Sequence, residues 1–249
     1  MAAPITLLEM RTRARSLSNM ETASPSSFVQ NSEMNQWIND GIKVLYDKLV
    51  HARGEDYYCV ESAVIPLVSG VSNYALPIVD KSGVSAPFYQ LLEVVCTNGS
   101  DYFRMMRFQR GETADAMNTH SFGYGFGTIP TAMNLRFRLG TNYIEIRPTP
   151  AVTGWGFIVY YVPICPTLVA DIDTFDGIDG FEDFAVLWAA IRALTKEESD
   201  TSALVSQFSL IDQRIGKMAP NRDSSQTRRI SDTRQDSAGV WSRRLRGQW

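Results

Sequence analysis

Residues with the chemistry to act as acids, bases or metal ligands are few in this chain. The two histidines are His51, near the end of an expected helix where a cation is favourable, and His120, in a glycine-rich loop. The three cysteines, Cys59, Cys96 and Cys165, are far apart and form no CxxC pair, which argues against a zinc site. No HExxH, GxSxG or Cys/His pairing occurs. We therefore expect no enzyme, no cofactor and no metal site.

Two short segments imitate ligand-binding motifs. The sequence GYGFG at 123–127 lacks the GxGxxG and GxxxxGK spacings of nucleotide-binding loops. Its alternation of aromatics and glycines suits either a loop tip that contacts a partner or a plain hairpin connection. The sequence DIDTFDG at 171–177 begins like a calcium loop, but Phe175 stands where an EF-hand needs an oxygen and Gly177 is one place late. We predict an acidic linker there, with an incidental surface cation left open. The aromatic residues of the possible interaction loop are Phe122, Tyr124 and Phe126.

Charge is distributed unevenly along the chain. Residues 218–249 hold seven arginines against three aspartates, a net charge of +4, whereas the whole chain carries −3. A basic tail on an acidic body is typical of an interaction arm. A second group of arginines lies in the middle of the chain and is compatible with a nucleic-acid patch or with solvated side chains. Its members are Arg104, Arg107, Arg110, Arg136 and Arg138.

Four helices are expected to position these groups. Residues 5–17 carry the Thr6/Glu9 spacing of a capping box. A second helix begins at Asn31 or Ser32, with Phe28 as a hydrophobic staple, and runs to about Gly54. Gly41 on its apolar stripe indicates a close approach to another helix.

Two further helices are predicted after Pro166. The first has Asp179 and Glu182 at cap spacing, and the second starts at a Ser/Asp cap and ends near Gly216 and Pro220. Each has an apolar stripe that needs a partner, so the N- and C-terminal pairs are expected to pack as a four-helix bundle. The stripe residues are Phe181, Phe184, Ala185, Trp188, Ile191 and Leu194 in the first helix and Leu204, Phe208, Ile211 and Ile215 in the second.

Between the helix pairs the apolar period changes from about four to two. Five to seven strands without intervening helices favour an antiparallel β-sandwich or small barrel. The clearest strand places Leu135, Phe137 and Leu139 on one face, and a hairpin is expected around Gly140–Asn142. The predicted fold is thus α+β. The domains are a helical bundle at 1–56 and 167–220, an inserted β-module at 57–166, and an extended C-terminal arm at 221–249.

Composition sets the broad class. Hydrophobic residues make up 44% and charged residues 20%, the ordinary mix for a packed globular protein. No apolar run reaches the roughly 20 residues of a membrane helix, and the N-terminus is a poor signal peptide. We expect a protein that is soluble, made in the cytoplasm and without membrane contact.

The two ends of the chain resemble podovirus head-to-tail adaptor proteins. The N-terminal match is "LLEMRTRARSLSNMETASPSSFVQNSEMNQWINDGIKVLYDKLVHARGEDYY", which contains the turn-and-cap segment and a helix with "LYDKL". The C-terminal match is "RIGKMAPNRDSSQTRRISDTR", a late helix followed by an arm. The resemblance covers about the first 58 and the last 45 residues, and the middle is similar in its β-rich character.

The resemblance implies a structural virion protein at the head–tail interface. Such adaptors form a ring, here expected to be a dodecamer, between the portal and the tail nozzle or other tail proteins, and DNA passes through the ring without sequence-specific binding. The C-terminal arm of the family docks on the portal. The alternative from the residues alone is a nucleic-acid-binding protein that uses its basic tail. The family-like arm positions are Arg222, Asp223, Arg228, Arg229 and Asp232.

The last ten residues, VWSRRLRGQW, are a separate inference about the same arm. Tryptophan and arginine are favoured anchors at protein interfaces. We expect this segment to contribute to portal docking rather than to DNA binding. Its anchors are Trp241, Arg243, Arg244, Arg246 and Trp249.

Overall fold

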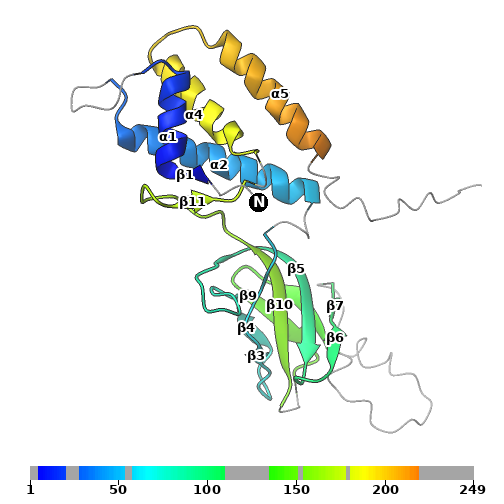
Figure 1. Ribbon diagram of the computed structural model, residues 1–249. Helices are drawn as coiled ribbons and strands as arrows, with labels where there is room; N and C mark the ends of the chain where they lie inside the picture. The colour runs from blue at the N-terminus through cyan, green and yellow to red at the C-terminus, as the bar shows by residue number, and fades with distance from the viewer. Residues whose placement is uncertain are drawn as a thin grey trace, which may run out of the picture.

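The computed structural model describes residues 5–20, 28–53, 58–109, 135–150, 154–177 and 180–218. These segments form an α+β fold with a helical unit and a β-sandwich (Figure 1). The helices are α1 (Leu7–Leu17), α2 (Asn31–Arg53), α4 (Asp183–Lys196) and α5 (Ser202–Met218). The strands are β1 (Ile5–Thr6), β2 (Val60–Glu61), β3 (Ile65–Pro66), β4 (Asn73–Ala75), β5 (Phe88–Thr97), β6 (Tyr102–Arg104), β7 (Met106–Arg107), β8 (Arg136–Leu139), β9 (Tyr143–Arg147), β10 (Gly156–Pro163) and β11 (Thr174–Phe175).

Helix starts follow local side-chain chemistry. The Thr6 hydroxyl accepts from the Glu9 backbone N–H and the Glu9 carboxylate accepts from the Thr6 N–H, which confirms the capping box of α1. At the start of α2 the Glu33 carboxylate accepts from the backbone N–H of Gln30 at 3.2 Å. The predicted staple at Phe28 is wrong, because Phe28 is 61% exposed and the neighbouring Val29 packs into the core instead.

The predicted four-helix bundle is wrong. α4 packs against the other three helices, and α5 packs chiefly on α4. The main core of the helical unit is closed instead by a non-helical segment, which contributes Val162, Leu168 and Phe175, whereas α5 supplies Ile215 as its one fully buried member of that core. In Figure 1, α2 lies across α1, whereas α4 and α5 run nearly side by side. The core of the helical unit is therefore shared between the helices and an extended segment, and is not closed by four helices alone.

The closest helix crossing is between α2 and α4. A methyl group built on Gly41 would lie 2.9 Å from the Cα atom of Ala185 and 3.1 Å from the Cβ atom of Trp188. A side chain at position 41 would push the two backbones apart, which costs packing energy across the core. The predicted close approach at Gly41 is confirmed.

Two sheets form the β-sandwich. One has the strand order β2–β10–β5–β6 with β3 also paired to β10, and the other has the order β4–β9–β8–β7. Their facing side chains share one core that includes Val94, Phe137, Ile144 and Phe157. The predicted hairpin is confirmed, since β8 and β9 pair antiparallel across Gly140–Asn142. The expectation of a purely antiparallel module is not met, because β7 pairs parallel to β8.

Candidate protein-docking surfaces

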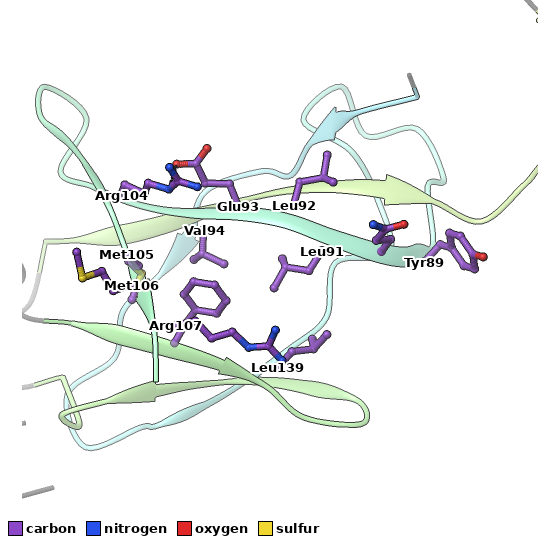
Figure 2. A pocket seen from close by; sticks show the side chains of 12 residues that line it. Tyr89, Leu91, Leu92, Glu93, Val94, Arg104, Met105, Met106, Arg107 and Leu139 are labelled. Atoms are coloured by element: carbon purple, nitrogen blue, oxygen red, sulfur yellow. Dashed lines mark ion pairs between the residues drawn. The ribbon is translucent and has the colours of Figure 1, made fainter. Parts of the chain in front are cut away.

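An open groove of about 680 Å³ lies between the two sheets on one side of the sandwich (Figure 2). It exists because β6 pairs with β5 only at Val95–Thr97, so the first half of β5 has no described strand on the side away from β10. We call this space the sheet groove. It is lined by Tyr89, Gln90, Leu91, Leu92, Glu93 and Val94 of β5, Arg104, Met105, Met106 and Arg107 of the β6–β7 segment, and Phe137 and Leu139 of β8.

The sheet groove combines apolar walls with a strand edge that has no partner among the described residues. Met106 is 71% exposed, and Figure 2 shows the side chain of Arg107 extending toward Leu139 on the neighbouring strand β8, along one wall of the groove. Arg104 is already paired with Glu93, with 3.0 Å between Nε and Oε1. An unpaired strand edge beside apolar walls suits an extended segment that adds to the sheet.

Two of the central arginines, Arg104 and Arg138, are held by carboxylates of the sandwich. Glu145 is buried and accepts hydrogen bonds from both Arg138 and Arg147, the latter at 2.9 Å from Nε. The Arg138 guanidinium also lies 5.4 Å from the ring centre of Phe108. These ion pairs neutralise the charge that a nucleic-acid patch would need. Arg110 lies outside the described residues.

The acidic segment after Leu168 is a rigid turn. The Asp173 carboxylate accepts from the backbone N–H groups of Val169 and Ala170 at 2.7 and 2.8 Å, and these hydrogen bonds lower the pKa of Asp173. The Asp171 carboxylate pairs with Arg11 at 3.0 Å. The carboxylates of Asp171 and Asp173 thus have structural roles. The described residues hold no cluster of three metal-ligating side chains.

This turn exposes two large aliphatic residues. Val169 is 79% and Ile172 is 82% exposed, although both stand on a segment whose backbone is fixed by hydrogen bonds. We call residues 169–172 the docking turn. Exposed aliphatic side chains whose backbone is already fixed can be buried by a partner with little further loss of conformational freedom.

A second groove, of about 530 Å³, lies between α1 and α5, with α4 as its floor. Its walls are mainly apolar, and Arg13 and Asp183 form a loose ion pair at its edge, 3.4 Å apart and about half exposed. We call it the helical groove. It is lined by Arg13, Ser16 and Leu17 of α1, Asp183, Val186 and Leu187 of α4, and Gln207, Leu210 and Ile211 of α5.

Cys96 and Cys165 are not activated as nucleophiles. Burial raises the pKa of the Cys96 thiol to about 11 and that of the Cys165 thiol to about 12, so neither forms a thiolate readily. The Nδ1 atom of His51 lies 2.6 Å from the carbonyl oxygen of Asp47 one helical turn earlier. His120 lies outside the described residues.

The residues predicted from the sequence as docking sites are not placed by the structure. The arm at 221–249 and the loop residues Phe122, Tyr124 and Phe126 lie outside the described residues. The structure instead shows two grooves and a docking turn that we did not predict from the sequence. In the described part of the chain, no helix is both long and apolar enough to cross a membrane.

The two grooves and the docking turn are candidate surfaces for contacts with other proteins. A family model described as SU10 adaptor protein matches residues 5–237. The chain belongs to the SU10 adaptor protein family, which confirms the resemblance to phage adaptors at the level of the family. A search of curated proteins gives no match.

Proposed function

We propose that the protein is a structural virion component that joins the portal to the tail as a ring of identical copies, expected to be a dodecamer. Membership of an adaptor family supports this function most directly. The outer surfaces support it too, since the helical unit keeps an apolar groove and an apolar turn exposed at the same time. DNA would pass through the ring without sequence-specific contacts.

The C-terminal arm is proposed to dock on the portal. It follows α5, the outlying helix of the unit, so an arm that leaves α5 need not cross the core to reach a partner. A segment that orders on binding covers a large surface, and tryptophan and arginine are its expected anchors.

The sandwich is proposed to contact the tail. In the sequence, Phe122, Tyr124 and Phe126 stand between Gln109 and Leu135, and these two residues are close in sequence to the groove residues Arg107 and Phe137. Loop and sheet groove would then act together on an extended segment of a tail protein.

The decisive experiment deletes residues 221–249. We expect the full chain to be monomeric alone, to have a protease-sensitive tail, and to form a ring when mixed with its portal, as seen by electron microscopy. The deletion variant should lose portal binding. A matched control replaces Phe122 and Tyr124 with alanine, which should leave portal binding intact. Unchanged binding after the deletion would overturn the role of the arm.

The alternative is nucleic-acid binding through the basic tail, whose net charge of +4 favours it. It predicts DNA affinity that falls steeply with salt. Absence of DNA binding at low salt would remove this alternative and leave the adaptor function untouched.

A further inference from the structure

We propose that the docking turn of one copy inserts into the helical groove of the neighbouring copy and so joins the copies head to tail. This inference rests on the proposed ring of identical copies, and it names the two surfaces that meet in that ring.

The docking turn is built to hold its shape without a partner. The backbone N–H of Leu7 donates to the Asp173 carbonyl at 2.9 Å, and that of Leu8 donates to the Asp171 carbonyl at 3.1 Å. The Arg11–Asp171 ion pair adds a side-chain link to α1. A turn fixed in this way loses little conformational freedom on binding, so more of the contact energy of Val169 and Ile172 is kept.

The helical groove offers an apolar surface of the kind that the exposed aliphatic side chains of the turn need. Its floor of Val186, Leu187 and Ile211 is apolar, as the side chains of the turn are. At its edge Arg13 forms only a loose ion pair with Asp183, at 3.4 Å, and its half-exposed guanidinium has further N–H groups that can also bind the exposed side of the Asp171 carboxylate while Asp171 keeps its pair with Arg11. Covering the groove also covers Leu210, which is 66% exposed.

The two surfaces lie in different places on α1, which sets the symmetry of the contact. The turn is tied to Leu7, Leu8 and Arg11, at the first turns of the helix and on one flank. The groove is lined by Arg13 and Leu17, on the opposite flank at the other end, and at ~1.5 Å of rise per residue Leu8 and Leu17 are roughly 13 Å apart along the axis. Figure 1 shows β11 and its turn below the N-terminal end of α1, away from α5.

A copy that has given its turn to one neighbour therefore still has its own groove open for another. Contacts of this head-to-tail kind close into rings when the rotation between copies divides a full turn, whereas two-fold contacts stop at a dimer. One turn in one groove is smaller than the roughly 1,000 Å² that a stable interface buries. The contact should thus be weak in free solution and form when copies are held together on the portal.

Engineered disulfides test the contact in the full chain. The background carries Cys59→Ser, because Cys59 is exposed. Ile172→Cys and Leu210→Cys are then introduced, separately and together; both positions are exposed, so folding should be little affected. After assembly on the portal and oxidation, the double variant should give a ladder of covalent multimers on a denaturing gel.

Mixing the two single variants gives a sharper signature. Each cysteine then finds a partner on one neighbour only, so the ladder should stop at dimers, and either single variant alone should give none. Rings seen by electron microscopy without the ladder would overturn this contact and leave the proposed function standing. If no ring forms on the portal, the proposed function fails. The same oxidation in concentrated solution then tests the contact separately: a ladder of covalent multimers supports the contact, and the absence of a ladder overturns it.

Discussion

The helices α4 and α5 follow one another in the chain and look alike in sequence, yet they serve different purposes. Both have apolar residues at three- and four-residue spacing. α4 buries seven residues because α1, α2 and α5 cover it on several sides, whereas α5 buries two and leaves Val205, Leu210 and Met218 exposed. The difference teaches that an apolar stripe shows a need for contact but does not say whether the chain or a partner supplies it.

The largest expected effect separates the two helices directly. Phe184→Ala in α4 removes a fully buried ring that stacks near Trp188 and Phe208, and should lower the free energy of unfolding by about 3–5 kcal/mol. Leu210→Ala in α5 should change it by less than about 0.5 kcal/mol. Urea unfolding measures both. Equal losses would mean that α5 is as much a part of the core as α4.

A smaller effect is expected where α2 holds the base of the docking turn. The Asn39 side chain accepts from the Leu168 N–H at 2.8 Å and donates to the Leu168 carbonyl at 3.0 Å. Asn39→Ala leaves two buried backbone groups without partners and should cost about 1–3 kcal/mol. Gln36→Ala, an exposed position on the same helix, is the control and should be near neutral. If thermal unfolding shows the same stability for the two variants, contacts other than those of Asn39 hold the segment around Leu168.

The smallest expected effect concerns pH and the docking turn. Backbone hydrogen bonds lower the pKa of Asp173 below its unfolded value of about 3.9, so its contribution to stability is present above that pH and is lost as the pH falls further. The difference in Tm between the native chain and Asp173→Asn should be full near pH 7 and shrink toward pH 2. A difference that stays constant across this range would show that the charge of Asp173 does not stabilise the turn.

Local signals in the sequence predicted local structure well. The Thr6/Glu9 capping box acts between residues three apart, and the close approach at Gly41 follows from a missing side chain on an apolar stripe. The bundle prediction failed because stripes indicate which faces need contact but not what covers them. Here Leu168 and Phe175, from a segment without helical periodicity, close the core. The strands β1 and β11 have two residues each and pair although Ile5 and Phe175 are far apart in the sequence. No local sequence pattern predicts this pair.

The candidate surfaces were harder to predict for a related reason. Val169 and Ile172 stand in an acidic segment, and their exposure depends on the turn that Asp173 fixes. The sequence signal that could have predicted this exposed surface was a pair of aliphatic residues three apart within an acidic turn. The sheet groove depends on where β6 stops pairing with β5, which is decided by tertiary packing rather than by the residues of β5.

One further consequence follows from how the chain enters and leaves the sandwich. It enters through β2 and leaves through β10, and these strands are hydrogen-bonded neighbours, with Val60 opposite Tyr161. If the sandwich were removed, the two chain ends left on the helical unit would lie only about 5 Å apart. A very short linker would rejoin them at little entropic cost. We expect that the sandwich can be exchanged for another domain, in evolution or by engineering. The same helical unit would then serve with a different tail.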